Sequence, residues 1–156
     1  MALYYNLPVY KASYKLVYML FESSGNFSRE YKYTVGEKIK DEGVFLVKNI
    51  YRANKAEDKT IHIKDARENI ETIRLFVRLM QDFKQLGLKP FVEINQEVEM
   101  VSKQLTAWEK YSKNQLSTPQ KGESKNIVGK VLPELSVARA QMSVHSNSNN
   151  PLAYNT

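Results

Sequence analysis

Large apolar residues recur every three or four positions in four separate segments of the sequence, and this spacing constrains the fold most strongly. Apolar residues spaced in this way fall on one face of an α-helix, which must then be buried against another element. The expected helices span residues 8–22, 29–56, 63–87 and 90–114. Because short polar loops join them and no segment is typical of a β-strand, the sequence predicts an all-α protein folded as an antiparallel up-down-up-down four-helix bundle.

Three of the expected helices carry a simple stripe of residues that should face the core. The stripes of the first, second and fourth helices are Tyr10, Tyr14, Val17 and Phe21; Val35, Ile39, Glu42, Leu46, Ile50 and Ala53; and Ile94, Val98, Val101, Leu105 and Trp108. Glu42 is either a buried carboxylate with a basic partner or a sign that the stripe rotates to turn Gly43 inward. Gly36 and Gly43 lie beside this stripe, where we expect them to let a neighbouring helix approach closely.

Proline, serine and glycine mark the ends of these helices. Pro8 and Pro90 suit the first turn of a helix, where a missing N–H costs nothing. Ser28 is a candidate N-cap of the second helix, and Gly87 is a candidate for the residue that follows the third. Residues 115–156 contain only six charged side chains, with six serines, five asparagines and three prolines. We therefore expect a bundle over residues 1–114 and a polar tail over 115–156, in which a short helix near 133–144 is a candidate element.

The third helix is apolar around more of its circumference than one core requires. On a wheel of about 100° per residue, the apolar side chains cover an arc of about 220°. One core needs little more than about 100°. Its bundle-facing stripe is Ile70, Ile73, Val77 and Met80, and the arc continues through Leu75, Phe76, Leu79, Phe83 and Leu86. The surplus predicts a second packing partner, such as another subunit.

The remaining polar strip of this helix carries Arg67, Arg74 and Arg78, which we call the arginine seam. The three residues form a line about 16 Å long, from a rise of about 1.5 Å per residue. The planar guanidinium group suits phosphate and carboxylate, so the seam could contact a nucleic-acid backbone or an acidic protein surface. The alternative is a solvated face, on which Arg67 and Arg78 pair with Glu71 or Asp82 four residues away.

Further basic residues extend this pattern. Lys64 lies at the margin of the seam, and the second helix carries Lys48, Arg52 and Lys55 on its outer side. Taken alone, the second-helix residues are typical of a solvated face. The formal net charge of the 156-residue chain is +6, which permits polyanions or acidic protein surfaces as partners.

Several classes of function lack the residues that they need. The sequence has no cysteine, and neither His62 nor His145 belongs to the Glu-x-x-His motif of bundle di-iron sites. A Gly-rich phosphate loop and a His-supported nucleophile are also missing. We therefore expect no catalytic residue, metal or cofactor. The apolar runs are too short to span a bilayer and the N-terminus does not resemble a signal peptide, so we expect a soluble cytoplasmic protein.

Four extended stretches resemble a known family. They are NFSREYKYTVGEKIKDE, NIYRAN, ARENIETIRLFVRLMQDFKQLG and SKQLTAWEK, in this order. The combination resembles the accessory variability determinant (Avd) proteins of diversity-generating retroelements, which belong to the four-helix-bundle family that includes the proteins encoded in 23S rRNA intervening sequences. The resemblance covers residues 7–114.

The resemblance implies a bundle that assembles into a barrel-like homopentamer with a basic surface. It also implies a non-enzymatic accessory protein that binds a reverse transcriptase and template RNA or cDNA, and supports mutagenic reverse transcription. The family's third-helix Arg-x-x-x-Arg pair falls on Arg74 and Arg78. Arg67, Lys64 and the basic residues of the second helix extend this candidate site by charge and geometry. The alternative is a helical oligomeric scaffold that binds only acidic protein surfaces, and a metal-dependent bundle enzyme is a more distant third.

Overall fold

A computed structural model of the chain describes residues 3–117, which are largely helical and contain no β-strand. The elements are a 3₁₀ turn, η1 (Tyr4–Asn6), and the helices α1 (Pro8–Gly25), α2 (Arg29–Lys32), α3 (Val35–Lys55), α4 (Thr60–Asp82) and α5 (Leu88–Ser117). The predicted all-α fold with four long helices is thus confirmed for the described residues. The candidate helix near 133–144 lies outside them.

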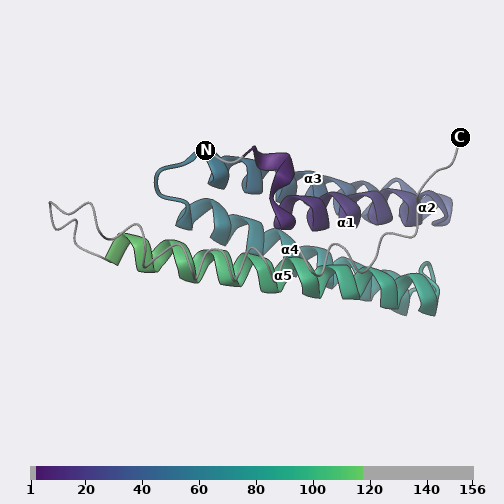
Figure 1. Cartoon of the computed structure of the whole chain (residues 1–156). Coiled ribbons are helices and arrows are strands. Elements are labelled where there is room, and N and C mark those ends of the chain that lie inside the picture. The colour runs from purple at the N-terminus through teal and green to yellow at the C-terminus, as the bar shows by residue number, and fades with distance from the viewer. Residues whose placement is uncertain (1–2, 118–156) are drawn as a thin grey trace, which may run out of the picture. The chain divides into compact units, whose positions relative to one another are not determined.

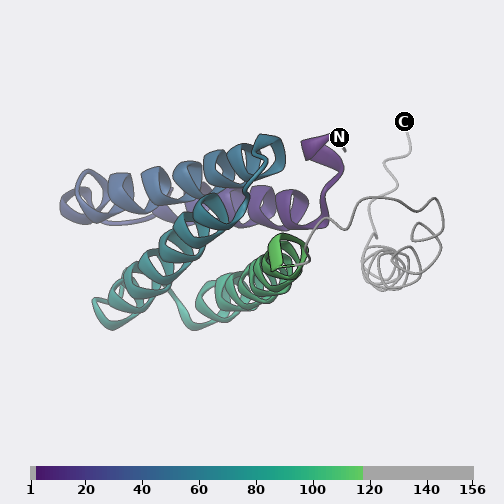
Figure 2. The same cartoon turned by 90° about the vertical axis from the view of Figure 1, so that its left-hand side faces the viewer.

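The four long helices alternate in direction and form two layers, α1 with α3 and α4 with α5 (Figures 1 and 2). Contacts between neighbours follow the cyclic order α1, α3, α4, α5 and back to α1. The α1–α3 and α4–α5 connections lie at one end of this arrangement, and the α3–α4 loop lies at the other (Figure 1). This order encloses a single apolar core.

The core stripes of α4 and α5 are as the sequence predicts. Ile70, Ile73, Val77 and Met80 of α4 are almost completely buried, as are Ile94, Val98, Val101 and Leu105 of α5. Trp108 is half-buried and packs against the same core. Burying a large aliphatic side chain contributes about 1.5–3 kcal/mol, so these two stripes stabilise the fold strongly.

The core face of α1 differs from the predicted stripe. Tyr14 and Phe21 are 61% and 47% exposed, and the buried apolar residues of α1 are instead Val9, Ala12, Leu16 and Leu20. The cause is the close approach of α1 to α3. A Cβ atom added to Gly43 would lie only 3.1 Å from Cγ2 of Val17. Such a close contact favours small and aliphatic side chains at the interface, so the aromatic rings turn outward.

The stripe of α3 rotates toward Gly43, one of the two outcomes considered for this helix. Gly43 is buried against α1, whereas Glu42 is half-buried and accepts a hydrogen bond of 2.9 Å from Nδ2 of Asn69 on α4. Glu42 therefore has an amide partner rather than a basic one. The predicted close approach at Gly43 is confirmed.

The predicted helix over residues 29–56 is interrupted, so that prediction was wrong in part. After the single turn of α2, Thr34 has φ −117° and ψ −90°, and α3 begins at Val35. The Thr34 hydroxyl donates to the carbonyl of Glu30 at 2.7 Å. In a continuous helix the Thr34 N–H would bond to that carbonyl, so the side chain replaces the backbone donor. Ser28 occupies the N-cap position of α2, but its side chain makes no capping hydrogen bond.

The ends of α4 also differ from the prediction. The helix begins at Thr60, where the Asp58 carboxylate accepts hydrogen bonds from the backbone N–H and the hydroxyl of Thr60. It ends at Asp82 rather than near Gly87. Lys84 adopts the left-handed conformation with φ 58°. The N–H groups of Lys84 and Gln85 bond to the carbonyls of Gln81 and Met80, which is the Schellman pattern of helix termination.

Candidate nucleic-acid interface

Six of the seven basic residues predicted to form the site fall into two rows, one on α4 and one on α3. The arginine seam faces α5, because Arg67 and Arg74 both pair with carboxylates of that helix. The second row, Lys48, Arg52 and Lys55, lies on α3, and we call it the α3 basic row. Lys64 is exposed near the start of α4. The structure therefore does not bring the predicted residues into one continuous patch.

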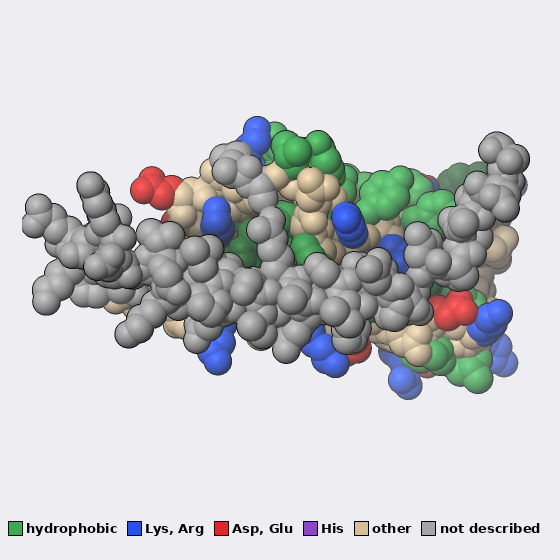
Figure 3. Space-filling view, in the orientation of Figure 1, with side chains coloured by type: hydrophobic (Ala, Val, Ile, Leu, Met, Phe, Trp, Pro, Cys, Tyr) green, Lys and Arg blue, Asp and Glu red, His purple; other side chains and the backbone are tan. Residues whose placement is uncertain are grey.

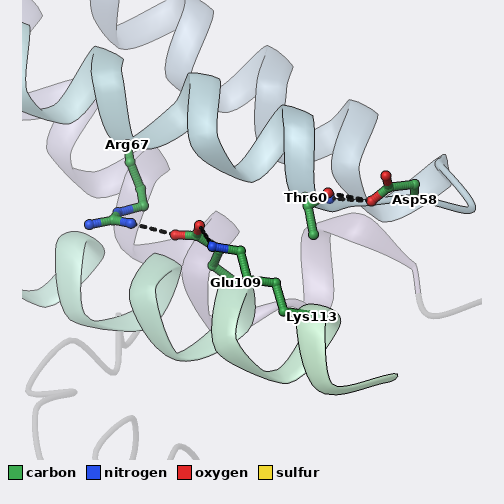
Figure 4. Close-up of polar contacts among 5 residues, drawn as sticks. All are labelled: Asp58, Thr60, Arg67, Glu109 and Lys113. Atoms are coloured by element: carbon green, nitrogen blue, oxygen red, sulfur yellow. Dashed lines mark hydrogen bonds and ion pairs between the residues drawn. The ribbon is translucent and has the colours of Figure 1, made fainter. Parts of the chain in front are cut away.

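Arg67 pairs with Glu109 of α5 (Figure 4). The pairing with Glu71 that the solvated-face alternative predicted is therefore not the one observed. Glu109 is almost buried and also accepts a hydrogen bond of 2.5 Å from Lys113, one turn along α5. The bond from Lys113 lowers the pKa of the Glu109 carboxyl, burial opposes this effect, and Arg67 adds to it. Glu109 is thus held as a carboxylate between two cations from two helices.

Arg74 also reaches across to α5, where it pairs with Glu99. Its Nε lies 3.3 Å from the carboxylate of Glu71, three residues earlier in α4. The hydrogen bond to Glu99 raises the pKa of Arg74 and lowers the pKa of Glu99 itself. The side chains of Arg74 and Glu99 are 36% and 50% exposed, so water screens this pair.

Arg78 pairs with Asp82 at 3.3 Å, the contact of the solvated-face alternative. Every arginine of the seam therefore has a carboxylate partner. The positively charged members of this ion-pair group are Arg67, Arg74, Arg78 and Lys113, and the negatively charged members are Glu71, Asp82, Glu99 and Glu109. These formal charges balance, so at distances beyond the Debye length the group exerts little net field.

The α3 basic row differs because the described contacts of Arg52 and Lys55 are with uncharged groups. Arg52 donates to the side-chain oxygen of Asn49 at 3.5 Å, and Nζ of Lys55 lies 4.6 Å from the ring centroid of Tyr51. Lys48 is exposed. Amide and ring contacts of this kind do not neutralise a positive charge, so the described contacts of the α3 basic row offset less charge than those of the arginine seam.

Part of the surplus apolar arc of α4 is used within the chain. Phe76 and Leu79 pack against the core, and Leu86 is buried. Leu75 remains 56% exposed, and Phe83 remains 49% exposed although its ring stacks on that of Tyr31 at 5.5 Å. The uncovered apolar surface of α4 is therefore smaller than the wheel suggests.

On the face shown in Figure 3, Lys and Arg side chains are mostly separated by acidic, apolar and other polar side chains in the visible described region. The acidic partners Glu99 and Glu109 were not predicted from the sequence, and neither was Lys15, which pairs with the buried Glu97 between α1 and α5. One signal was available for the first two. Glu99 directly follows the buried Val98, and Glu109 lies one turn after the buried Leu105. Carboxylates in such positions can reach a neighbouring helix.

Residues 3–117 contain no group of three or more His, Asp or Glu side chains placed to hold a metal ion. Within the same range, none of the helices has the length and apolar character required to span a bilayer.

These observations define a small all-α domain in which four long helices surround one core and display two basic rows. A family model described as bAvd-like matches residues 9–112, from the start of α1 to near the end of α5, and the chain belongs to this family. The resemblance to Avd proteins is therefore confirmed. The family is one of retroelement accessory proteins and is not a known enzyme family. No curated protein matches the sequence significantly.

Proposed function

We propose that the chain is a non-catalytic accessory protein that binds a retroelement reverse transcriptase and its template RNA or cDNA, and thereby supports mutagenic reverse transcription. Family membership supports the retroelement role. The observation that carries the nucleic-acid part is the α3 basic row, whose described contacts are with neutral groups. We place the primary phosphate contacts on this row and secondary contacts on Arg74 and Arg78, with weaker contributions from Arg67 and Lys64.

Binding of RNA at graded salt concentrations tests this proposal. A labelled single-stranded RNA should bind the full chain with an affinity that falls linearly on a plot of log affinity against log salt. Each phosphate contact adds about 0.7 to this slope for single strands, so Lys48→Ala/Arg52→Ala/Lys55→Ala should flatten it by about 2. Fluorescence anisotropy provides the affinity, and circular dichroism checks that the variant stays helical.

The matched control removes the same number of charges from scattered exposed positions. Lys38→Ala/Lys89→Ala/Lys110→Ala carries the same net charge as the α3-row variant, and all three lysines are exposed. A long-range effect of net charge would lower the affinity equally in both variants and would argue against a defined row. If the wild type binds no RNA even at low salt but still captures a reverse transcriptase, the alternative of a scaffold for acidic protein surfaces is favoured.

We also propose that copies of the chain assemble as a homopentamer through apolar surface that the single chain leaves uncovered. Such surface is provided by Leu75 of α4, by Phe83 directly after α4, and by Val44 and Phe45 of α3. Exposed apolar patches of this kind mark association sites. Light scattering of the purified chain should give five times the monomer mass, whereas a monodisperse monomer would defeat this part of the proposal.

A further inference from the structure

The arginine seam cannot bind a new anion without changing the contacts of its arginines. Each of Arg67, Arg74 and Arg78 already contacts a carboxylate of the same chain. A guanidinium group presents the same donor fork to carboxylate and to phosphate. A phosphate group that approaches the seam must therefore compete with the carboxylates for the same N–H groups.

The carboxylates differ in how easily they can leave. The Glu109 side chain is only 11% exposed and is held by both Arg67 and Lys113. Releasing Arg67 would remove one partner of an almost buried charge, which is costly. The Glu99 side chain is 50% exposed, so water can solvate it once Arg74 turns away. Replacing Glu99 on Arg74 by another anion therefore costs less free energy than replacing Glu109 on Arg67.

We infer that Glu99 occupies, on Arg74, the position that a phosphate of single-stranded RNA would take, and that this competition sets how strongly the arginine seam binds RNA. The inference rests on the proposed function. It assigns to Glu99 a role in affinity rather than in folding, because a pair as exposed as Arg74–Glu99 contributes little to stability. It also predicts a weak contribution of Arg74 to RNA binding while Glu99 is present.

The competition has a signature in the salt dependence of binding. In the wild type, a phosphate that reaches Arg74 releases its counterion, but the freed Glu99 carboxylate attracts a cation in return. The two effects oppose each other, so this contact adds little to the slope of log affinity against log salt. Without the carboxylate, the same contact should contribute its full share of about 0.7.

The test compares Glu99→Gln with the wild type as full-length chains, using a labelled oligouridylate in fluorescence anisotropy at several salt concentrations. Removing an exposed competitor of this kind should tighten binding by about two- to five-fold and steepen the slope by about 0.7. Arg74→Ala/Glu99→Gln should lose both gains. Glu93→Gln is the control, because Glu93 is an exposed carboxylate on the same helix and its removal changes the net charge equally.

The outcomes separate this inference from the proposed function. If Glu99→Gln and Glu93→Gln behave alike while the α3-row variant still weakens RNA binding, only the inference fails. If neither the wild type nor Glu99→Gln binds RNA, both fail, whereas binding by Glu99→Gln alone supports the competition. Polyglutamate serves as a model of an acidic protein surface. If Glu99→Gln binds polyglutamate more tightly than the wild type does but binds RNA no more tightly, the seam is assigned to an acidic protein surface and the inference is overturned. Glu99→Ala repeats the test if Glu99→Gln loses helicity.

Discussion

Asn49 on α3 donates its side-chain amide to Oδ1 of Asn69 on α4 at 2.9 Å, which links two helices through an almost buried polar side chain. The chain of bonds continues in both directions. Asn69 donates to Glu42, and Asn49 accepts from Arg52 of the α3 basic row. A basic residue at the surface is thereby connected to the interface between α3 and α4, and the two amides fix the register of these helices.

The first prediction concerns this pair. Asn69→Ala should destabilise the chain by about 1–3 kcal/mol, because it leaves the nearly buried amide of Asn49 without its partner. Asn49→Ala/Asn69→Ala should cost less than the sum of the two single substitutions, since neither amide then remains. Urea unfolding followed by circular dichroism measures these differences. Strict additivity would show that the hydrogen bond does not couple the two residues.

The second prediction concerns the close contact of α1 with α3. Gly43→Val should destabilise the protein by about 1–3 kcal/mol or more, because the added atoms overlap with Val17 and Leu20. Val17 is β-branched and has little freedom to rotate in a helix. Gly25→Ala is the control, since an added Cβ there meets nothing within 4 Å. Val17→Ala should restore part of the stability of Gly43→Val, and no restoration would locate the cost elsewhere.

The third prediction concerns the left-handed residue after α4. Lys84 has φ 58°, a conformation that costs a non-glycine residue roughly 1–2 kcal/mol. Lys84→Gly should therefore stabilise the chain by about 0.5–1 kcal/mol, after allowing for the greater freedom of glycine in the unfolded state. Lys84→Asn separates the loss of charge from the backbone effect, because asparagine also tolerates this conformation. A destabilised Lys84→Gly in urea unfolding would contradict the prediction.

The fourth prediction concerns the pH dependence that Glu109 confers. Its pKa is lowered in the folded chain, chiefly by the hydrogen bond from Lys113. A group with a lowered folded pKa stabilises the protein above its unfolded pKa of about 4.3, and this contribution is lost as the pH falls through the folded value. Glu109→Gln should therefore cost about 1 kcal/mol at pH 7, a figure discounted for the exposure of Arg67 and Lys113.

The difference between Glu109→Gln and the wild type should shrink in unfolding experiments below about pH 4. Glu93→Gln, on the same helix, provides the control for a simple change of net charge. A destabilisation of Glu109→Gln that stays constant down to acid pH would indicate a packing effect rather than a charge effect.

The fold could be predicted where a core stripe repeats at regular helical spacing. In α4, Ile70, Ile73, Val77 and Met80 repeat at helical spacing, and all four are buried. In α1 the predicted stripe through Tyr14 and Phe21 was wrong, because a second stripe through Ala12 and Leu16 has the same helical spacing and is the buried one. The choice is decided by Gly43 on another helix, so it depends on tertiary packing that local periodicity does not contain.

The candidate site was harder to predict because its partners are distant in sequence. Arg78–Asp82 is an i,i+4 pair and was considered from the sequence alone. Arg67–Glu109 and Arg74–Glu99 span 42 and 25 residues, so they depend on how α5 aligns with α4. The roles of these residues in binding stay predictions.

The hydrogen bond from the N–H of Ser28 to Oε1 of Gln85, at 2.8 Å, has a consequence for how the helices open. It ties the α1–α3 connection to the α4–α5 connection at one end of the bundle (Figure 1). The other end holds the α3–α4 loop and the exposed last residues of α5. We therefore expect amide hydrogens to exchange faster toward that end, and a partner bound at Lys55 or Lys64 should reduce exchange there most.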